Sequence, residues 1–172
     1  MNDQSFSIRP AASRPYMPGY GINEAADGLL AWERVSRQMA EARNYWVCTT
    51  RPDGRPHAAP IWGVWLDETF YFGTGRGSVK GRNLARNPAI SLHLESGDDV
   101  VILEGVAVEV TDRARLGHIY EVYGQKYGLD MSASAEEGAE PTYALRPALA
   151  FAWLEKDFPH TATRFEFGVV TG

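Results

Sequence analysis

The sequence predicts a mainly β protein in which short antiparallel strands close into a barrel and two or three helices pack around it. Runs of alternating apolar and polar residues are short, as in 89–95, where three aliphatic residues share one face. Tight turns join consecutive runs, for example at Pro52-Asp53-Gly54 and at Asp67-Glu68. Closure of such a sheet removes its exposed edges, so a barrel is the expected architecture.

The N-terminal segment 1–26 is expected to be an extended or partly disordered arm, because prolines and glycines interrupt it, and such an arm could pack on a partner subunit. The remaining residues, 27–172, are expected to form one domain. A helix capped by Asp27 is expected over 28–44. Its apolar residues recur at helical spacing: Leu29, Trp32, Val35 and Met39.

The strands are expected to follow one another through short connections. Pro56 and Pro60 cannot donate ladder hydrogen bonds, so the second strand is expected at an edge or with an interruption that leaves backbone groups free for a planar ring. Glu104-Gly105 predicts a bulge. A helix capped by Asp112 is expected before the last strands, followed by a loop over 128–141 that is a lid or a mobile segment. The expected strands are 45–50, 57–66, 70–74, 89–95, 100–110, 142–145, 149–154 and 163–167, with a loop over 156–161.

The stretch from Gly73 to Pro88 predicts a phosphate site. Glycines at every second position from Gly73 to Gly77 let a ligand approach the backbone closely. Ser78 is placed as the N-cap of a helix that reaches about Arg86, and a helix N-terminus attracts anions. Arg76, Lys80 and Arg82 add positive charge there, although a solvated surface would also explain them. The residue order does not fit a Walker A loop, and the helix is too short for a dinucleotide fold.

The residues from Tyr45 to Glu104 resemble the pyridoxamine 5′-phosphate oxidase-like superfamily. The resemblance rests on Pro52-Asp53-Gly54-Arg55-Pro56-His57, on Phe70-Tyr71-Phe72-Gly73-Thr74, and on Ser-x-Lys-x-x-Asn-Leu-x-x-Asn-Pro from Ser78 to Pro88. It implies a split, Greek-key-type barrel of six or seven strands that binds FMN or a deazaflavin. Many members carry Arg where this sequence has Val79, so Arg76 or Arg82 would supply the missing cation.

The resemblance also implies cofactor contacts. The ring would lie along the second strand, at Pro60, Ile61 and Trp62, and Trp62 and Trp65 would face opposite sides. Family members are usually homodimers that hold the cofactor at the interface, so a homodimer with shared contacts is expected. The other implied contacts are Thr74 near the ribityl phosphate, Ser78, Lys80 and Arg82 at the phosphate, and Asp99 near the ring.

The deazaflavin coenzyme F420 is the favoured cofactor, with FMN as the alternative. The run from Lys80 to Pro88 looks more like the deazaflavin-using branch. A deazaflavin carries an acidic tail beyond its phosphate, and Arg76, Arg82 and Arg86 extend positive charge in that direction. The expected function is therefore hydride transfer to or from a small molecule. A pyridoxamine or pyridoxine phosphate oxidase is an alternative. Such an enzyme is expected to carry an Arg/His motif for the substrate phosphate near its C-terminus, and Arg164-Phe165-Glu166 matches that motif poorly. A non-catalytic flavin or haem carrier is another.

Composition narrows the class of function. A net charge of −5 argues against nucleic acid as a partner. No apolar run follows Met1 and no stretch is long enough to span a membrane, so a cytoplasmic protein without a membrane partner is expected. Cys48 is the single cysteine and is expected to be a small core residue. The histidines show no metal-ligand spacing, and no catalytic triad motif is present, so a bound redox cofactor is expected to supply the reactivity.

Overall fold

The computed structural model describes residues 9–131 and 140–168, and these form a mainly antiparallel β fold with few helices, as predicted. One sheet contains all nine strands of the described residues. The strands are β1 (Ala11–Ser13), β2 (Tyr45–Thr50), β3 (Pro56–Ile61), β4 (Val64–Leu66), β5 (Thr69–Gly73), β6 (Ala89–His93), β7 (Asp99–Glu109), β8 (Thr142–Leu154) and β9 (Thr163–Glu166). The helices are α1 (Trp32–Glu41), α2 (Val79–Leu84), α3 (Arg113–Tyr127) and α4 (Phe158–Thr161), with a 3₁₀ turn at Glu155–Asp157.

The strand order explains why the barrel is split. The main path runs β1-β9-β8-β7-β6-β2-β3, while β5 also pairs with β8 and β4 pairs with β5. The first part of β8 pairs with β5 and its last part with β9, so the sheet divides along this strand. Within the described residues no ladder joins β3 to β4, so the expected full closure of the barrel is wrong. The chain leaves the sheet after Ile61, and Trp62-Gly63 separate β3 from β4.

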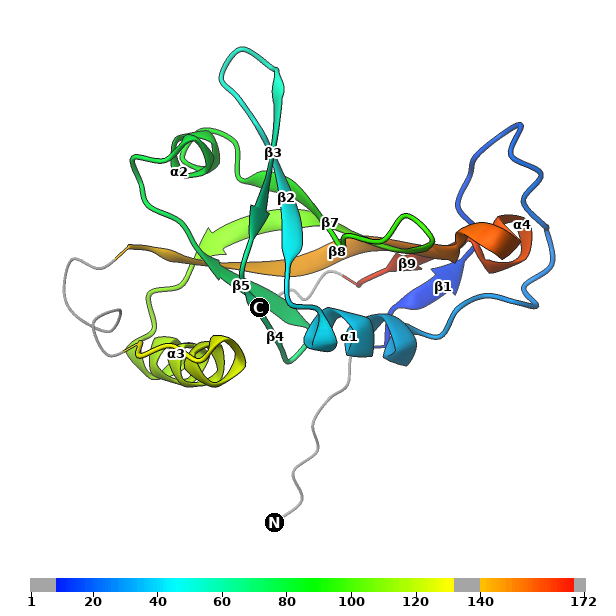
Figure 1. Ribbon diagram of the computed structural model, residues 1–172. Coiled ribbons are helices and arrows are strands. Elements are labelled where there is room, and N and C mark those ends of the chain that lie inside the picture. The colour runs from blue at the N-terminus through cyan, green and yellow to red at the C-terminus, as the bar shows by residue number, and fades with distance from the viewer. Residues whose placement is uncertain (1–8, 132–139, 169–172) are drawn as a thin grey trace.

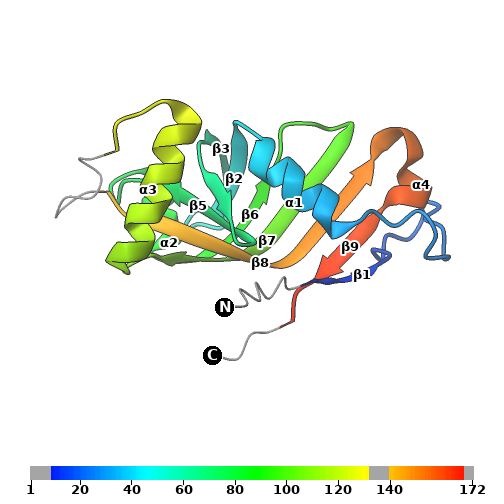
Figure 2. The ribbon, with the colours of Figure 1, turned by 90° about the horizontal axis from the view of Figure 1, so that it is seen from below.

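The core lies between the curved sheet and α1. Figure 2 shows α1 and α3 in front of the strands, with β1 and β9 along the far edge of the sheet. Val35 and Met39 of α1 are fully buried, as the helical spacing predicts, and they meet inward side chains of the strands such as Tyr45 and Leu92. Burying an aliphatic side chain of this size stabilises the fold by about 1.5–3 kcal/mol.

The start of α1 differs from the expectation. The helix begins at Trp32, and its N-cap, Ala31, makes no side-chain capping bond. Gly28 has a φ of +86°, in the left-handed region, so the helix cannot extend back to the expected cap at Asp27. The backbone carbonyl of Asp27 instead accepts a hydrogen bond from Arg14.

The long strand β8 also corrects an expectation. The segments 142–145 and 149–154 form one continuous strand and not two. Pro147 lacks an N–H group, and the register with β7 shifts there, between Glu104 and Gly105. The predicted bulge at Glu104-Gly105 is therefore confirmed. Gly105 has no side chain at this point because a Cβ atom would lie 2.8 Å from the carbonyl oxygen of Arg146.

The remaining expectations fall on the edges of the sheet. The prolines of β3 lie on an edge strand, as predicted, because β3 pairs only with β2. The expected loop over 156–161 contains α4 and part of the 3₁₀ turn. Part of the expected N-terminal arm, β1, pairs with β9 of the same chain. Residues 132–139 of the expected lid lie outside the described residues. No helix of the described residues is long and apolar enough to cross a membrane.

Candidate functional site

The glycine-rich turn after β5 leads directly into α2, and two hydroxyl groups hold its shape. The Oγ atom of Ser78 accepts a hydrogen bond from the Gly81 N–H at 2.9 Å, so the predicted N-cap is confirmed. The hydroxyl of Thr74, which is buried, lies 2.9 Å from the same Oγ atom. The helix ends at Leu84, earlier than the expected Arg86, and it is too short for its dipole to hold an anion without side-chain help.

Close approaches of the chain explain two of the glycines. A Cβ atom on Gly81 would clash with the carbonyl oxygen of Gly75, so α2 can pack on the turn only with glycine there. A Cβ atom on Gly75 would clash with a carboxylate oxygen of Glu140, which lies against the turn from the start of β8. Glu140 therefore places a negative charge beside the expected phosphate site.

A hollow of about 690 Å³ opens over this turn. Lys80 reaches it, and its ammonium group makes no hydrogen bond or ion pair with any residue in 9–131 or 140–168. Such a cation is available to an anionic ligand. The lining residues are Gly73, Thr74, Gly75, Arg76, Gly77, Ser78, Lys80, Glu140 and Pro141.

A second hollow, of about 440 Å³, is strongly basic. We call it the arginine pocket. It lies between α2 and the β2–β3 turn, which projects beside α2 in Figure 1. Its residues are Arg51, Pro52, Asp53, Arg55, Arg76, Val79, Arg82, Asn83, Ala85 and Arg86. Arg76 lines both hollows, so positive charge extends from the turn across α2 to the hairpin.

Three of the five arginines in this pocket already have partners. Arg55 pairs with Asp53 at 2.8 Å, and Arg76 forms a bidentate pair with Glu109. Arg82 donates a hydrogen bond to the carbonyl of Gly77, which uses part of its donor capacity within the turn. The guanidinium groups of the other two, Arg51 and Arg86, have no hydrogen-bond or ion-pair partner among the described residues.

A buried polar network fixes α2 to the sheet. Asn83 is almost fully buried and donates a hydrogen bond of 2.9 Å to the hydroxyl of Thr49 on β2. The same hydroxyl lies 3.5 Å from Nδ1 of His57 on β3. Burial lowers the pKa of His57, and the charges of Arg51 and Lys80 lower it further. His57 therefore favours its neutral form between these two cations.

The expected ring contacts lie around the end of β3. Pro60 is exposed on the edge strand, and Ile61 is buried in the core. Trp62 is 40% exposed and stacks on Tyr127 of α3 at 4.6 Å, whereas Trp65 is buried. Trp62 lies in the break between β3 and β4 and Trp65 lies on β4, so the two tryptophans do not share one strand as expected. Pro60 and Trp62 thus offer exposed surface, and Ile61 offers only its backbone.

The backbone at the interruption after β3 is not free, contrary to the expectation. The Gly63 N–H donates to the Tyr127 hydroxyl at 3.0 Å, and the Gly63 carbonyl accepts from Lys126 at 3.0 Å. Lys126 also donates to the hydroxyl of Tyr45 at 2.8 Å. Burial and the nearby charge of Arg43 lower the pKa of Lys126 to about 8. These contacts from α3 hold the break between β3 and β4.

Asp99 lies far from the glycine-rich turn of the same chain. It pairs with Leu154 at the last residue of β8, whereas Gly73 pairs with Thr142 at the first. A strand of 13 residues spans about 40 Å. Asp99 instead forms an ion pair of 2.6 Å with Arg34 of α1. Burial raises the pKa of Asp99, but hydrogen bonds with Arg34 and Gln38 lower it overall. Within one chain the structure therefore brings together Thr74, Ser78, Lys80 and Arg82, but not Asp99.

Sequence reasoning did not single out four residues of this region. Arg51 and His57 come from the β2–β3 hairpin, Asn83 from the inner side of α2, and Glu140 from the segment before β8. The motifs around them are visible in the sequence, but nothing in the chain order shows that the hairpin and α2 lie side by side. No group of three His, Cys, Asp or Glu side chains within the described ranges could hold a metal ion.

Comparison with known proteins gives one family. The family model described as pyridoxamine 5′-phosphate oxidase matches residues 31–154. No curated protein matches the sequence.

Several solved structures share the fold. A conserved hypothetical protein from Mycobacterium tuberculosis is 23% identical with a TM-score of 0.66, over 77% of this chain and 89% of that one. A protein named F420 reductase is 23% identical with a TM-score of 0.53, over 66% of this chain and 94% of that one. HutZ, a heme storage protein from Vibrio cholerae, is 19% identical with a TM-score of 0.56, over 67% and 87%. At these identities the similarity shows the fold alone.

Proposed function

The chain belongs to the pyridoxamine 5′-phosphate oxidase family, and from that premise we propose that it is an oxidoreductase whose cofactor is the deazaflavin F420, with FMN as the alternative. One observation carries the proposal. The ammonium of Lys80 lacks a counter-ion among the described residues, and it lies where the glycine-rich turn meets the arginine pocket. A phosphate with an acidic extension is the ligand that this arrangement of charge suits.

The residues of the turn fit a phosphate group. The hydroxyls of Thr74 and Ser78 share one hydrogen bond, which uses one of their two O–H hydrogens and leaves the other for a phosphate oxygen. Lys80 adds a charge-assisted contact. The side chain of Glu140 is exposed, so its carboxylate can rotate away from the turn when an anion binds.

The arginine pocket favours the deazaflavin over FMN. FMN ends at its phosphate, whereas F420 continues into an acidic tail. Arg51 and Arg86 offer guanidinium groups without partners in the described chain, at a position beyond Lys80. The similarity to a protein named F420 reductase agrees with this choice.

The other contacts would orient the ring. Pro60, Ile61 and Trp62 lie at the end of β3, where the exposed part of Trp62 would border a flat ring, with Tyr127 stacked on the Trp62 ring and Arg43 5.5 Å from its centroid. When bound, the cofactor would supply hydride transfer to or from a small molecule. The proposed assembly is a homodimer with the cofactor at the interface. In this proposed dimer, Asp99, which lies about 40 Å along β8 from the turn of its own chain, would contact the cofactor held by the turn of the partner subunit.

The two alternative functions have less support. For a pyridoxamine phosphate oxidase, Arg164 would have to bind substrate phosphate, but it pairs with Glu166 at 2.8 Å on β9. A carrier function agrees with the similarity to HutZ, which is named a heme storage protein. That similarity is in the fold, and turnover of the cofactor would separate a carrier from an enzyme.

The test is turnover. Reduced F420 is mixed with the protein and with a panel of quinones, nitroaromatics and conjugated ketones, and oxidation is followed by absorbance. Many equivalents oxidised per protein, with a marked loss of rate in Lys80→Ala at limiting cofactor, would support the enzyme. Oxidation of no more than one bound equivalent would identify a carrier.

A further inference from the structure

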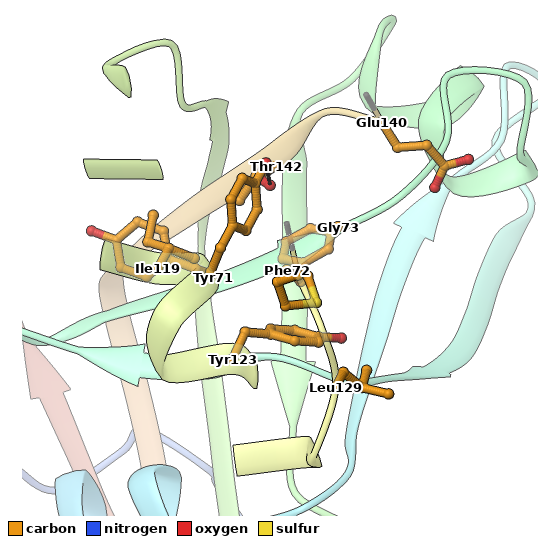
Figure 3. Close-up of a pocket in the computed structure, with 10 residues that line it drawn as sticks. Tyr71, Phe72, Gly73, Ile119, Tyr123, Leu129, Glu140 and Thr142 are labelled. Carbon is orange, nitrogen blue, oxygen red and sulfur yellow. Dashed lines mark hydrogen bonds between the residues drawn. The ribbon is translucent and has the colours of Figure 1, made fainter. Parts of the chain in front are cut away.

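A third hollow lies between α3, β5 and the beginning of β8, and it is lined mainly by aromatic and aliphatic side chains. We call it the aromatic pocket; it is drawn in Figure 3 and has a volume of about 410 Å³. Its residues are Tyr71, Phe72, Gly73, Ile119, Tyr120, Tyr123, Leu129, Met131, Glu140 and Thr142. It adjoins the phosphate hollow, with which it shares Gly73 and Glu140.

No charged group is directed into the aromatic pocket from its described walls. Glu140 is the one ionisable acid among the lining residues, and its carboxylate points away from the rings, toward Gly75 (Figure 3). The nearby Arg115 donates two hydrogen bonds to the hydroxyl of Tyr71 and pairs with Asp67 at 3.0 Å. Its charge is therefore already satisfied outside the pocket.

The uncharged polar side-chain groups among the lining residues are hydroxyls. The hydroxyl of Tyr120 lies 3.1 Å from that of Thr142, so this pair is mutually satisfied. The hydroxyl of Tyr123 makes no hydrogen bond with a described residue. Burial, together with Tyr127, raises the pKa of Tyr123 to about 12, so the group stays an uncharged O–H donor at neutral pH. It is the polar group that a ligand could use.

We propose that the aromatic pocket binds an uncharged planar compound of one or two rings, with the hydroxyl of Tyr123 as its polar contact. The volume falls within the range of about 300–1,000 Å³ that is usual for small-molecule sites. Aromatic walls pack well against flat rings. A charged ligand would lose its hydration without gaining a partner of opposite charge.

This site goes beyond the proposed function and does not depend on it. The pocket adjoins the phosphate end of the proposed cofactor site, and no residue of the expected ring site, Pro60 to Trp62, lines it. Its ligand would therefore be bound in addition to a cofactor, and binding can be measured on the protein without one.

Indole and two charged derivatives with the same ring test the proposal by calorimetric titration at pH 7. Indole is small, so a Kd of about 1 mM or somewhat tighter is expected. Tryptamine, a cation, and indole-3-acetate, an anion, should bind at least about tenfold more weakly because each brings a charge into an uncharged site. Equal binding of all three, or no indole binding at 1 mM protein and excess ligand, would overturn the proposal.

Two variants locate the binding. Leu129 is 45% exposed at the rim, so Leu129→Asp should fold normally and weaken indole binding at least about tenfold. Tyr123→Phe keeps the ring and removes the hydroxyl, and should weaken it by about two- to tenfold. Tyr16→Phe, at a residue that is 91% exposed, is the matched control and should change nothing. Thermal melts verify that each variant is folded. If Leu129→Asp is unfolded, the comparison of indole affinity between Tyr123→Phe and Tyr16→Phe tests the proposal alone. Unchanged indole affinity in the folded pocket variants would refute the assignment.

Discussion

The replacement Lys80→Ala removes the cation on which the proposed phosphate site depends. Lys80 is half-buried at the hollow over the glycine-rich turn and has no competing acidic partner within the described chain. Within residues 9–131 and 140–168 the variant therefore leaves no carboxylate without an ion-pair partner. The change should affect ligand binding much more than stability.

The size of the effect follows from the kind of contact. A hydrogen bond to a charged group is worth about 1.5–3 kcal/mol. At about 1.4 kcal/mol per factor of ten, Lys80→Ala should weaken binding of F420 or FMN by about tenfold to somewhat more than a hundredfold. Riboflavin, which lacks the phosphate, should bind wild type and variant with the same affinity to within about twofold.

Calorimetric titration of FMN and riboflavin into both proteins measures this directly. Lys156→Ala is the control, because Lys156 is an exposed lysine in the 3₁₀ turn that follows the last residue of β8. Losses of the same size for FMN and riboflavin would refute the reasoning, since Lys80 would then act on the fold or on the ring. Unaltered FMN affinity in Lys80→Ala would refute it as well.

Three other changes test separate parts of the account. Glu140→Gln removes the negative charge beside Gly75 and should strengthen FMN binding by up to about fivefold in the same titration, since exposed charge pairs contribute about 0.2–1 kcal/mol; weaker binding would contradict this. Asn83→Ala leaves the hydroxyl of Thr49 without its donor and should destabilise the fold by about 1–3 kcal/mol in urea unfolding, and an unchanged midpoint would contradict it. Lys126 has a folded-state pKa of about 8, below its usual 10.5, so the unfolded chain binds this proton more tightly than the folded protein does. As the pH rises from about 8 to about 9.5, the free energy of unfolding of wild type should therefore increase relative to that of Lys126→Met. A stability difference independent of pH would show that Lys126 is not held as described.

Local signals in the sequence were sufficient for most strands and for two helix starts. Ser78 and Asp112 each accept a backbone N–H three residues on, as their positions before α2 and α3 predict. The bulge at Glu104-Gly105 was also visible, because a glycine inside a strand pattern marks such a site. These features depend on residues close in sequence.

The errors arose where contacts between distant segments decide the structure. The break after β3 is held by Tyr127 and Lys126 of α3, more than 60 residues later in the chain, and no local pattern indicates that its backbone is already bonded. The segments 142–145 and 149–154 were expected to be separate strands, but the bulge at Glu104-Gly105 lets β8 continue through Pro147.

The candidate site divides in the same way. Thr74, Ser78 and Lys80 lie within seven residues of one another in the chain, so the sequence places them together. Arg51 joins them only because the β2–β3 hairpin folds beside α2, and Asp99 is separated from them by the length of β8.

The central claim is that the site was built for a phosphate with an acidic tail, and a parallel titration of F420 and FMN at low and at raised salt tests it most directly. The account predicts that F420 binds more tightly than FMN. It also predicts that raising the salt from about 0.05 M to about 0.5 M weakens F420 binding more than FMN binding, because salt screens the charges of the arginine pocket. Tighter binding of FMN, or an F420 affinity that does not change with salt, would contradict the account.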